Sequence, residues 1–221
     1  MFTRMCQAFA AVVAAAVLAL AACSAPQPVP SASASRETVT ALFVGDSYTE
    51  GVGLAEPREE RWSSLVASLL GWDEVNAGCG GSGYTRRGLA CGNTFEERID
   101  SLSGIDADVV VIWGGVNDAG AAPDEAANAA QATIAAFAEA FPDAELVVIN
   151  AMYFAAPEPA PLAAINAALP AAVTEASGRW IDVGPLLARD SSLLGPDGLH
   201  PTAEGHARIA AAVVAELGGA Y

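Results

Sequence analysis

The stretch that decides the fold is Ala41-Leu42-Phe43-Val44-Gly45-Asp46-Ser47. Four apolar residues run directly into Gly45, so the pattern predicts a buried strand that ends in a turn. The turn places a carboxylate and a hydroxyl at the carboxyl edge of the strand, where open α/β sheets hold their ligands. Gly, Asp and Ser are also ordinary turn residues, so this stretch alone does not distinguish a reactive Ser47 from a simple connection.

Apolar runs like this one recur along the chain and alternate with segments of helical periodicity. Strands are predicted at 38–44, 74–77, 108–113, 145–150 and 180–183, and helices at 61–70, 95–102, 123–141, 161–177 and 203–217. The run from Val109 to Trp113 is apolar throughout, which is typical of a central strand in a parallel sheet. The alternation predicts an α/β fold with three layers and a doubly wound parallel sheet of about five strands. Pro170 is expected to kink or split its helix.

Composition and charge limit the possible partners. The chain has 221 residues, 53% of them hydrophobic, which is enough for one sizeable core and predicts a single domain. The formal net charge is −16, and all ten basic residues are arginine. Such an acidic surface repels phosphate backbones, so no nucleic acid is expected as a partner. Neutral and cationic substrates are compatible with this charge.

The N-terminal segment predicts export. Arg4 precedes an apolar run over 8–20, which has the length of a signal-peptide core and is short for a membrane span. The following Leu20-Ala21-Ala22-Cys23 resembles the lipobox of bacterial lipoproteins, which implies that Cys23 is lipidated and anchors the protein to the outer face of the cell membrane. The expected organisation is a signal peptide over 1–22, the lipidated cysteine and a Pro/Ser/Ala tether over 23–37, and the domain over 38–221. If the lipobox is not used, the protein is secreted.

Cysteine usage agrees with export. Cys6 and Cys23 belong to the leader, which leaves Cys79 and Cys91 as the pair within the domain. In an oxidising compartment such a pair is expected to form a disulfide. A zinc site is the alternative, but the histidines are more than a hundred positions away and the ligand count is too low, so no metal is expected.

The scarcity of histidine restricts the choice of a general base. His200 lies in a loop of turn-forming residues just before the last helix, and Asp197 is three positions upstream, close enough for its carboxylate to reach the imidazole Nδ1. His206 falls within the first turns of that helix and is expected to be partly exposed, without a catalytic role.

Four motifs carry a resemblance to a known family. Gly45-Asp46-Ser47-Tyr48-Thr49 and Asp197-Gly198-Leu199-His200-Pro201 resemble blocks I and V of the SGNH hydrolases, the GDSL-type lipase/esterase superfamily. Asn76-Ala77-Gly78-Cys79-Gly80-Gly81 resembles block II, and Gly115-Val116-Asn117-Asp118 resembles block III. The motifs occur in the family's order and span most of the domain, which implies the flavodoxin-like SGNH hydrolase fold.

The resemblance also implies roles for individual residues. Ser47 is expected to be the nucleophile, His200 the base and Asp197 its carboxylate partner, without a cofactor. The oxyanion hole is expected to consist of the backbone N–H groups of Ser47 and Gly81 and the side-chain amide of Asn117. The choice of Gly81 over the glycines at 78 and 80 rests on spacing alone.

Three other residues of the motifs are expected to have structural roles. Tyr48 stands where the commonest family form has leucine, which predicts apolar packing. Asp46 and Asp118 are interpreted as turn and cap residues.

The segment 78–83 also satisfies the dinucleotide-binding pattern G-x-G-x-x-G, with Asp100 in the place of a ribose-binding acid. That pattern should open a helix, whereas 84–93 has no apolar stripe, so a dinucleotide role is not expected.

The sequence therefore predicts an exported serine esterase that acts on a small-molecule or saccharide ester, with a monomer as the default state. No long apolar lid segment is present, which favours short acyl or acetyl groups. Two alternatives stay open. One is a polysaccharide deacetylase or O-acyltransferase that uses the same site, and the other is a catalytically silent binding module.

Overall fold

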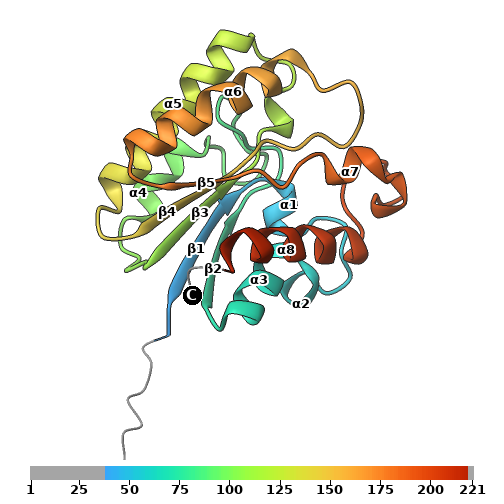
Figure 1. Cartoon of the computed structure of the whole chain (residues 1–221), viewed down its shortest axis with the longest axis horizontal. Coiled ribbons are helices and arrows are strands. Elements are labelled where there is room, and N and C mark those ends of the chain that lie inside the picture. The colour runs from blue at the N-terminus through green and yellow to red at the C-terminus, as the bar shows by residue number, and fades with distance from the viewer. Residues whose placement is uncertain (1–37, 219–221) are drawn as a thin grey trace, which may run out of the picture. The chain divides into compact units, whose positions relative to one another are not determined.

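The centre of the fold is a five-stranded sheet in which all neighbouring strands run parallel (Figure 1). The computed structural model describes residues 38–218; the predicted signal peptide, the lipidated Cys23 and the tether lie outside this range. The strands are β1 (Thr40–Gly45), β2 (Asp73–Gly78), β3 (Val109–Trp113), β4 (Glu145–Ile149) and β5 (Arg179–Ile181), in the order β2-β1-β3-β4-β5. This arrangement confirms the predicted α/β class and the parallel sheet.

Helices cover both faces of the sheet and produce three layers (Figure 1). One face carries α1 (Ser47–Glu50), α2 (Pro57–Glu60), α3 (Trp62–Leu70) and α8 (Ala203–Leu217). The other carries η1 (Glu96–Arg98), α4 (Ile99–Leu102), α5 (Pro123–Ala140) and α6 (Ala160–Glu175). The short elements η2 (Val116–Asp118), α7 (Leu186–Arg189) and η3 (Ser191–Leu193) lie in the connections. Among residues 38–218, no helix is both long and apolar enough to cross a membrane.

Residues 41–44 of strand β1 are all apolar because both faces of the strand are covered by helices. Alternate side chains of a strand point to opposite faces, so a strand covered on both sides needs apolar residues throughout. Ala41 and Phe43 pack into the core beneath α3 and α8, whereas Leu42 and Val44 pack into the core beneath α5 and α6. All four side chains are fully buried.

The strand order places a topological switch point at β1. The chain moves outward from β1 to β2, then crosses back over β1 to β3 and continues in the opposite direction to β5. The connections after β1 and β3 therefore diverge to opposite faces and leave a crevice at the carboxyl ends of these strands, the usual ligand position in this class of fold. Ser47 follows β1 and Asn117 follows β3, so both lie at this edge.

Pro170 does not split its helix. α6 continues through Pro170 from residue 160 to 175, although proline cannot donate a hydrogen bond to the carbonyl four positions earlier. The face of α6 that carries Leu162, Ile165, Leu169 and Val173 is buried against the sheet. Buried residues on both sides of the proline accompany the uninterrupted helix.

His206 is buried, and the expectation of partial exposure was wrong. Its side chain is 0% exposed in α8, where Nδ1 accepts a hydrogen bond from the backbone N–H of Trp62 at 3.2 Å. Nε2 has no hydrogen-bond partner among the described residues. Burial, with a smaller contribution from the charge of His200, lowers the pKa of His206 to about 4. His206 therefore joins α8 to α3 as a neutral side chain.

We expect this histidine to make the fold less stable in acid. Since its pKa is about 4 when folded and near 6.5 when unfolded, the unfolded chain binds more protons between these values, and the free energy of unfolding falls as the pH falls through this window. Between pH 7.5 and pH 5 the wild type should lose about 2 kcal/mol more than His206→Asn, which keeps an acceptor but does not titrate. Urea unfolding of both proteins at the two pH values measures this difference, and equal losses would contradict it.

The predicted disulfide between Cys79 and Cys91 is present in the connection from β2 to η1. This connection contains no strand. Tyr84 and Phe95 within it are buried in the core beneath α5 and α6, whereas Leu89 is 87% exposed. Gly88 lies against both sulfur atoms, where an added Cβ would come within 2.4 Å of Cys79 Sγ. The covalent link therefore supports the exposed part of the loop around Leu89.

Replacing both cysteines by serine should lower the free energy of unfolding by about 3 kcal/mol, the loop-closure value for a ring of this size. Denaturant unfolding of the double variant measures the loss. The matched control is the wild-type protein unfolded by denaturant in the presence of dithiothreitol. Reduction of the disulfide should lower its free energy of unfolding by the same amount without any substitution. Unchanged stability in both cases would mean that the loop is held by its non-covalent contacts.

Candidate active site

Ser47 is the first residue of α1 and directly follows the turn at the end of β1. Its side chain lies at the carboxyl edge of the sheet, and the residue is 7% exposed. A backbone N–H in the first turn of a helix has no acceptor within that helix. The N–H of Ser47 is therefore available to an external acceptor beside its own hydroxyl.

The turn before Ser47 has no room for a side chain at Gly45. A Cβ there would lie 2.1 Å from Thr49 Oγ1 and 2.5 Å from the carbonyl oxygen of Trp113, both far inside van der Waals contact. α1 therefore folds back tightly over the end of β1, and glycine is required for this close approach.

Of the two aspartates expected to be turn and cap residues, Asp46 caps a helix, whereas Asp118 lies within η2 and contacts the loop after β2. Asp46 is the N-cap of α1, and its Oδ1 accepts the backbone N–H of Tyr48 at 2.9 Å. Burial raises the pKa of Asp46 to about 7, although the hydrogen bond from Tyr48 opposes this shift. Asp118 accepts hydrogen bonds from the backbone N–H groups of Tyr84 and Thr85 and from the Thr85 hydroxyl, so it braces the loop after β2.

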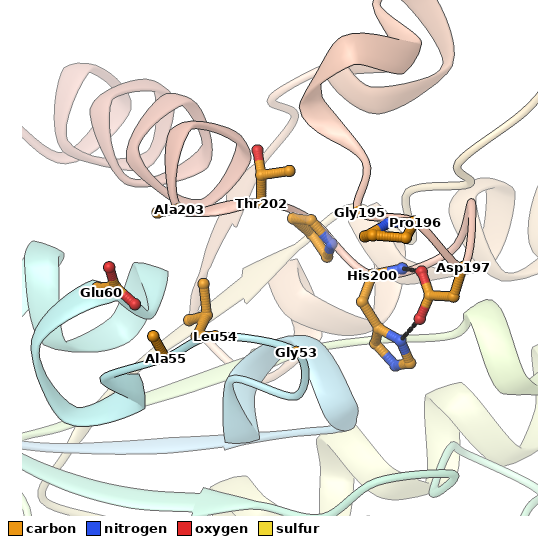
Figure 2. A pocket seen from close by; sticks show the side chains of 11 residues that line it. Gly53, Leu54, Ala55, Glu60, Gly195, Pro196, Asp197, His200, Thr202 and Ala203 are labelled. Carbon is orange, nitrogen blue, oxygen red and sulfur yellow. Dashed lines mark hydrogen bonds and ion pairs between the residues drawn. The ribbon is translucent and has the colours of Figure 1, made fainter.

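His200 and Asp197 form a hydrogen-bonded pair in the loop before α8. Figure 2 shows that the Asp197 carboxylate receives two hydrogen bonds from His200, one from the ring and one from the backbone. The Oδ2–Nδ1 distance is 2.6 Å, and Oδ1 accepts the backbone N–H groups of Leu199 and His200 at 3.0 Å. The hydrogen bond from His200, followed by those from the two backbone groups, lowers the pKa of Asp197 to about 2. An ionised Asp197 therefore holds the proton on Nδ1 and leaves Nε2 as the basic nitrogen.

The three glycines of the second motif differ in the use of their backbone N–H groups. The N–H of Gly78 donates to Asn76 Oδ1 at 3.0 Å, and that of Gly80 donates to Glu50 Oε2 at 2.6 Å. Within residues 38–218, the N–H of Gly81 has no hydrogen-bond partner. Gly81 has a φ of +78°, a conformation that glycine adopts without strain. This difference supports Gly81 as the glycine whose backbone N–H is available to an external acceptor.

Asn117 lies in η2 after β3, and its Nδ2 donates to the carbonyl of Ser82 at 2.9 Å. A side-chain amide carries two hydrogens, so one bond to Ser82 positions the group and leaves a second donor. The disulfide and the Asn117 contact thus hold the two ends of the same short segment, 79–82.

Arg98 is a residue that the sequence analysis missed. Its guanidinium is buried and donates to the carbonyl oxygens of Gly45 and Ala77 and to the Ser82 hydroxyl. It therefore joins the carboxyl ends of β1 and β2 to the loop that contains Gly81. Phe95, Arg98 and Leu102 share one face of the 95–102 segment, so an arginine at a buried position of an amphipathic pattern was the available signal.

The structure gathers the predicted residues at one edge of the sheet but does not join all of them. A Cβ at Gly80 would lie 3.8 Å from Ser47 Cβ, and the ring of His200 is 6.0 Å from the ring of Tyr48. No hydrogen bond links the Ser47 hydroxyl to His200 in the part of the chain described. Such bonds between nucleophile and base are often long without substrate and tighten when it binds.

Two cavities open near this edge. One of about 430 Å³ lies between the segment 53–55 and the loop 195–203, with His200 and Asp197 in its wall (Figure 2). A second of about 590 Å³ lies beyond the ends of β4 and β5, where Tyr153, Trp180 and Asn166 contribute to its lining. Between residues 38 and 218, no group of three or more His, Cys, Asp or Glu side chains is arranged to hold a metal ion.

Comparison with known proteins places these residues in a family. Residues 43–208 match the GDSL-like lipase/acylhydrolase family. The chain is 28% identical over 176 residues to the GDSL lipase Rv0518 of Mycobacterium tuberculosis (strain ATCC 25618 / H37Rv), with 76% of each chain covered.

The fold is similar to that of solved structures of more distant sequence. Est24, a carbohydrate acetylesterase from Sinorhizobium meliloti, superposes with a TM-score of 0.69 at 18% identity over 83% of this chain and 100% of its own. A variant of Axe2, an acetyl xylan esterase from Geobacillus stearothermophilus, gives 0.60 at 20% identity over 81% and 94%. The chain belongs to the GDSL-like lipase/acylhydrolase family and is a carboxylic ester hydrolase.

Proposed function

We propose that this esterase uses Ser47, His200 and Asp197 as its catalytic triad and works through an acyl-enzyme. The observation that carries the proposal is the 2.6 Å bond from His200 Nδ1 to Asp197 Oδ2, in a chain with only one other histidine, which is buried. This bond orients the imidazole so that Nε2 is the ring nitrogen left for Ser47 at the same sheet edge. A hydroxyl and an oriented base at one edge are what acyl transfer requires.

The reaction would proceed in two balanced steps. Ser47 Oγ attacks the ester carbonyl while His200 Nε2 takes the hydroxyl proton, and the tetrahedral intermediate collapses as Nε2 returns that proton to the departing alcohol. Water, deprotonated by the same nitrogen, then attacks the acyl-serine, and Nε2 returns that proton to Ser47 Oγ as the bond to the acyl group breaks and the acid is released. In both steps the N–H groups of Ser47 and Gly81 and the second hydrogen of Asn117 Nδ2 would stabilise the oxyanion.

The proposed substrate is an ester of a short acyl group, with an acetylated saccharide as the favoured kind. The cavity at the ends of β4 and β5 combines the aromatic rings of Tyr153 and Trp180 with the polar side chains of Asn166 and Glu158. Aromatic faces beside amide and carboxylate groups suit a sugar ring better than an extended acyl chain. The activities named for the two solved relatives, which act on acetylated carbohydrates, point the same way.

The proposed location is the extracytoplasmic face of the cell membrane, with Cys23 as the lipidated residue. The disulfide between Cys79 and Cys91 supports an oxidising compartment. In that setting an envelope saccharide could also discharge the acyl-enzyme in place of water, which keeps deacetylase and O-acyltransferase activities as alternatives. A catalytically silent binding module is disfavoured by the ester hydrolase family.

Substitution of the site residues should lower ester turnover to different degrees. With p-nitrophenyl acetate, Ser47→Ala should lose kcat by about 10⁶-fold, and Asn117→Ala by about 10²- to 10³-fold, because one oxyanion donor is removed while the nucleophile stays. Ser103→Ala and Asn128→Ala, both at exposed positions, are matched controls with unchanged turnover. Turnover by Ser47→Ala equal to that of the wild type would exclude Ser47 as the nucleophile.

The dependence of ester turnover on the length of the acyl chain should discriminate short-acyl from lipolytic activity. We expect kcat/KM for p-nitrophenyl esters to be highest for acetate and butyrate and to fall by about 10-fold or more for laurate, since each extra methylene gains little without an apolar surface to bury it. Acetate release from acetylated xylose, with and without an added saccharide acceptor, then separates hydrolysis from transfer. A maximum at laurate or palmitate would overturn the short-acyl assignment.

A further inference from the structure

Tyr48 makes a contact that its position in the sequence does not suggest. It is the second residue of α1, directly after Ser47, and it is 3% exposed. Its hydroxyl donates a hydrogen bond of 2.7 Å to the carbonyl of Leu199, which lies 151 positions away and directly precedes His200. The expectation of apolar packing therefore holds for the ring but misses the hydroxyl.

The ring of Tyr48 lies between the core and the base. It packs edge-on against Trp113 with ring centroids 5.8 Å apart, and its centroid is 6.0 Å from that of His200 at an interplanar angle of 67°. Trp113 is itself held by a hydrogen bond from Nε1 to the carbonyl of Asn150. One end of the Tyr48 side chain is thus held by the sheet, and the other reaches the loop that carries His200.

The other attachments of that loop lie at its two ends, where Leu194 and Pro201 form an isolated β-bridge and the N–H of Thr202 donates to the carbonyl of Leu193. Pro196, Asp197 and Gly198 are exposed, and the Asp197 side chain is 51% exposed. Inside the loop, the N–H of Gly195 donates to the carbonyl of His200, and Asp197 accepts hydrogen bonds from its own neighbours. These bonds shape the loop locally but do not set its distance from α1.

We propose that Tyr48 is a positioning residue whose hydroxyl, through the Leu199 carbonyl, holds His200 at its working distance from Ser47. The inference rests on the proposed triad. Because Ser47 and Tyr48 are consecutive in one helical turn, a movement of the nucleophile is transmitted to the base by a single side chain. Leucine, the commonest family residue here, cannot form this bond, so the device is a feature of this chain.

The hydroxyl is available as a donor under all working conditions. Burial, with smaller contributions from the charges of Asp46 and Asp197, raises the pKa of Tyr48 well above its usual value. The phenol therefore stays protonated, and the bond to Leu199 does not depend on pH within the range of activity.

Tyr48→Phe removes the hydroxyl and keeps the ring. We expect kcat for p-nitrophenyl acetate to fall about 10- to 100-fold with KM nearly unchanged, because a base displaced by a fraction of an ångström loses rate but not binding. Thermal unfolding of both proteins records any general loss of structure.

Tyr84→Phe is the matched control. Tyr84 is also 3% exposed and packs on an aromatic ring, Phe95, but its hydroxyl has no hydrogen-bond partner among residues 38–218. Loss of the Tyr84 hydroxyl should leave kcat and KM unchanged. Equal effects of the two substitutions would indicate a general response to removing a buried hydroxyl and would overturn the assignment of Tyr48.

A double-mutant cycle with His200→Ala separates positioning from a structural role. If Tyr48 acts through the base, Tyr48→Phe should change the residual turnover of His200→Ala by less than about twofold, in contrast to its effect in the wild type. The same fall in both backgrounds would overturn the proposal, and so would a Tyr48→Phe enzyme with wild-type kcat. Failure of the triad itself would appear separately, as full turnover by Ser47→Ala.

Discussion

The site depends on the carbonyl of Gly45, the last residue of β1. This oxygen accepts the backbone N–H of Cys79 at 3.0 Å, the Arg98 guanidinium at 2.9 Å and the Ser82 hydroxyl at 3.4 Å. The same residue pairs with Gly78 on one side and Trp113 on the other, so it joins three strands at their carboxyl ends. The nucleophile turn and the loop of Gly81 are thereby fastened to one peptide group.

The buried charge of Arg98 explains why so many acceptors converge there. A desolvated guanidinium is costly unless its N–H groups are satisfied. Two carbonyls and a hydroxyl accept hydrogen bonds from its two terminal nitrogens, whereas Nε has no hydrogen-bond partner within residues 38–218. Burial lowers the pKa of Arg98 to about 10, with Asp46 and Glu50 opposing the shift, so the side chain stays charged at neutral pH. In the proposed mechanism, this positive charge beneath the Gly81 loop would favour the negative charge on a tetrahedral intermediate, in a protein whose net charge is −16.

Features that depend on local pattern were predictable, whereas those set by packing were not. The strand before Ser47 and the pairing of Asp197 with His200 follow from residues within a few positions of one another, and the sheet order then brings them to one edge. The burial of His206 depends on how α8 packs on α3, and the continuity of α6 at Pro170 depends on its contact with the sheet. Within residues 38–218 Arg98 makes no hydrogen bond to a carboxylate, so only its place in an apolar pattern marked it in the sequence.

The two halves of the site differ in how firmly they are held, and the difference matches their tasks. The proposed oxyanion donors lie on segments tied by a disulfide, by Arg98 and by strand ends, and donors of this kind are effective when they need no reorganisation during the reaction. The proposed base lies in a loop whose Asp197 side chain is half exposed, and in the proposed mechanism it would pass a proton from the nucleophile to the leaving group and then take one from water. A rigid oxyanion site and a less firmly held base would suit these steps, provided that a contact fixes the distance of the loop from α1, and the contact we propose is the hydrogen bond from the Tyr48 hydroxyl to Leu199.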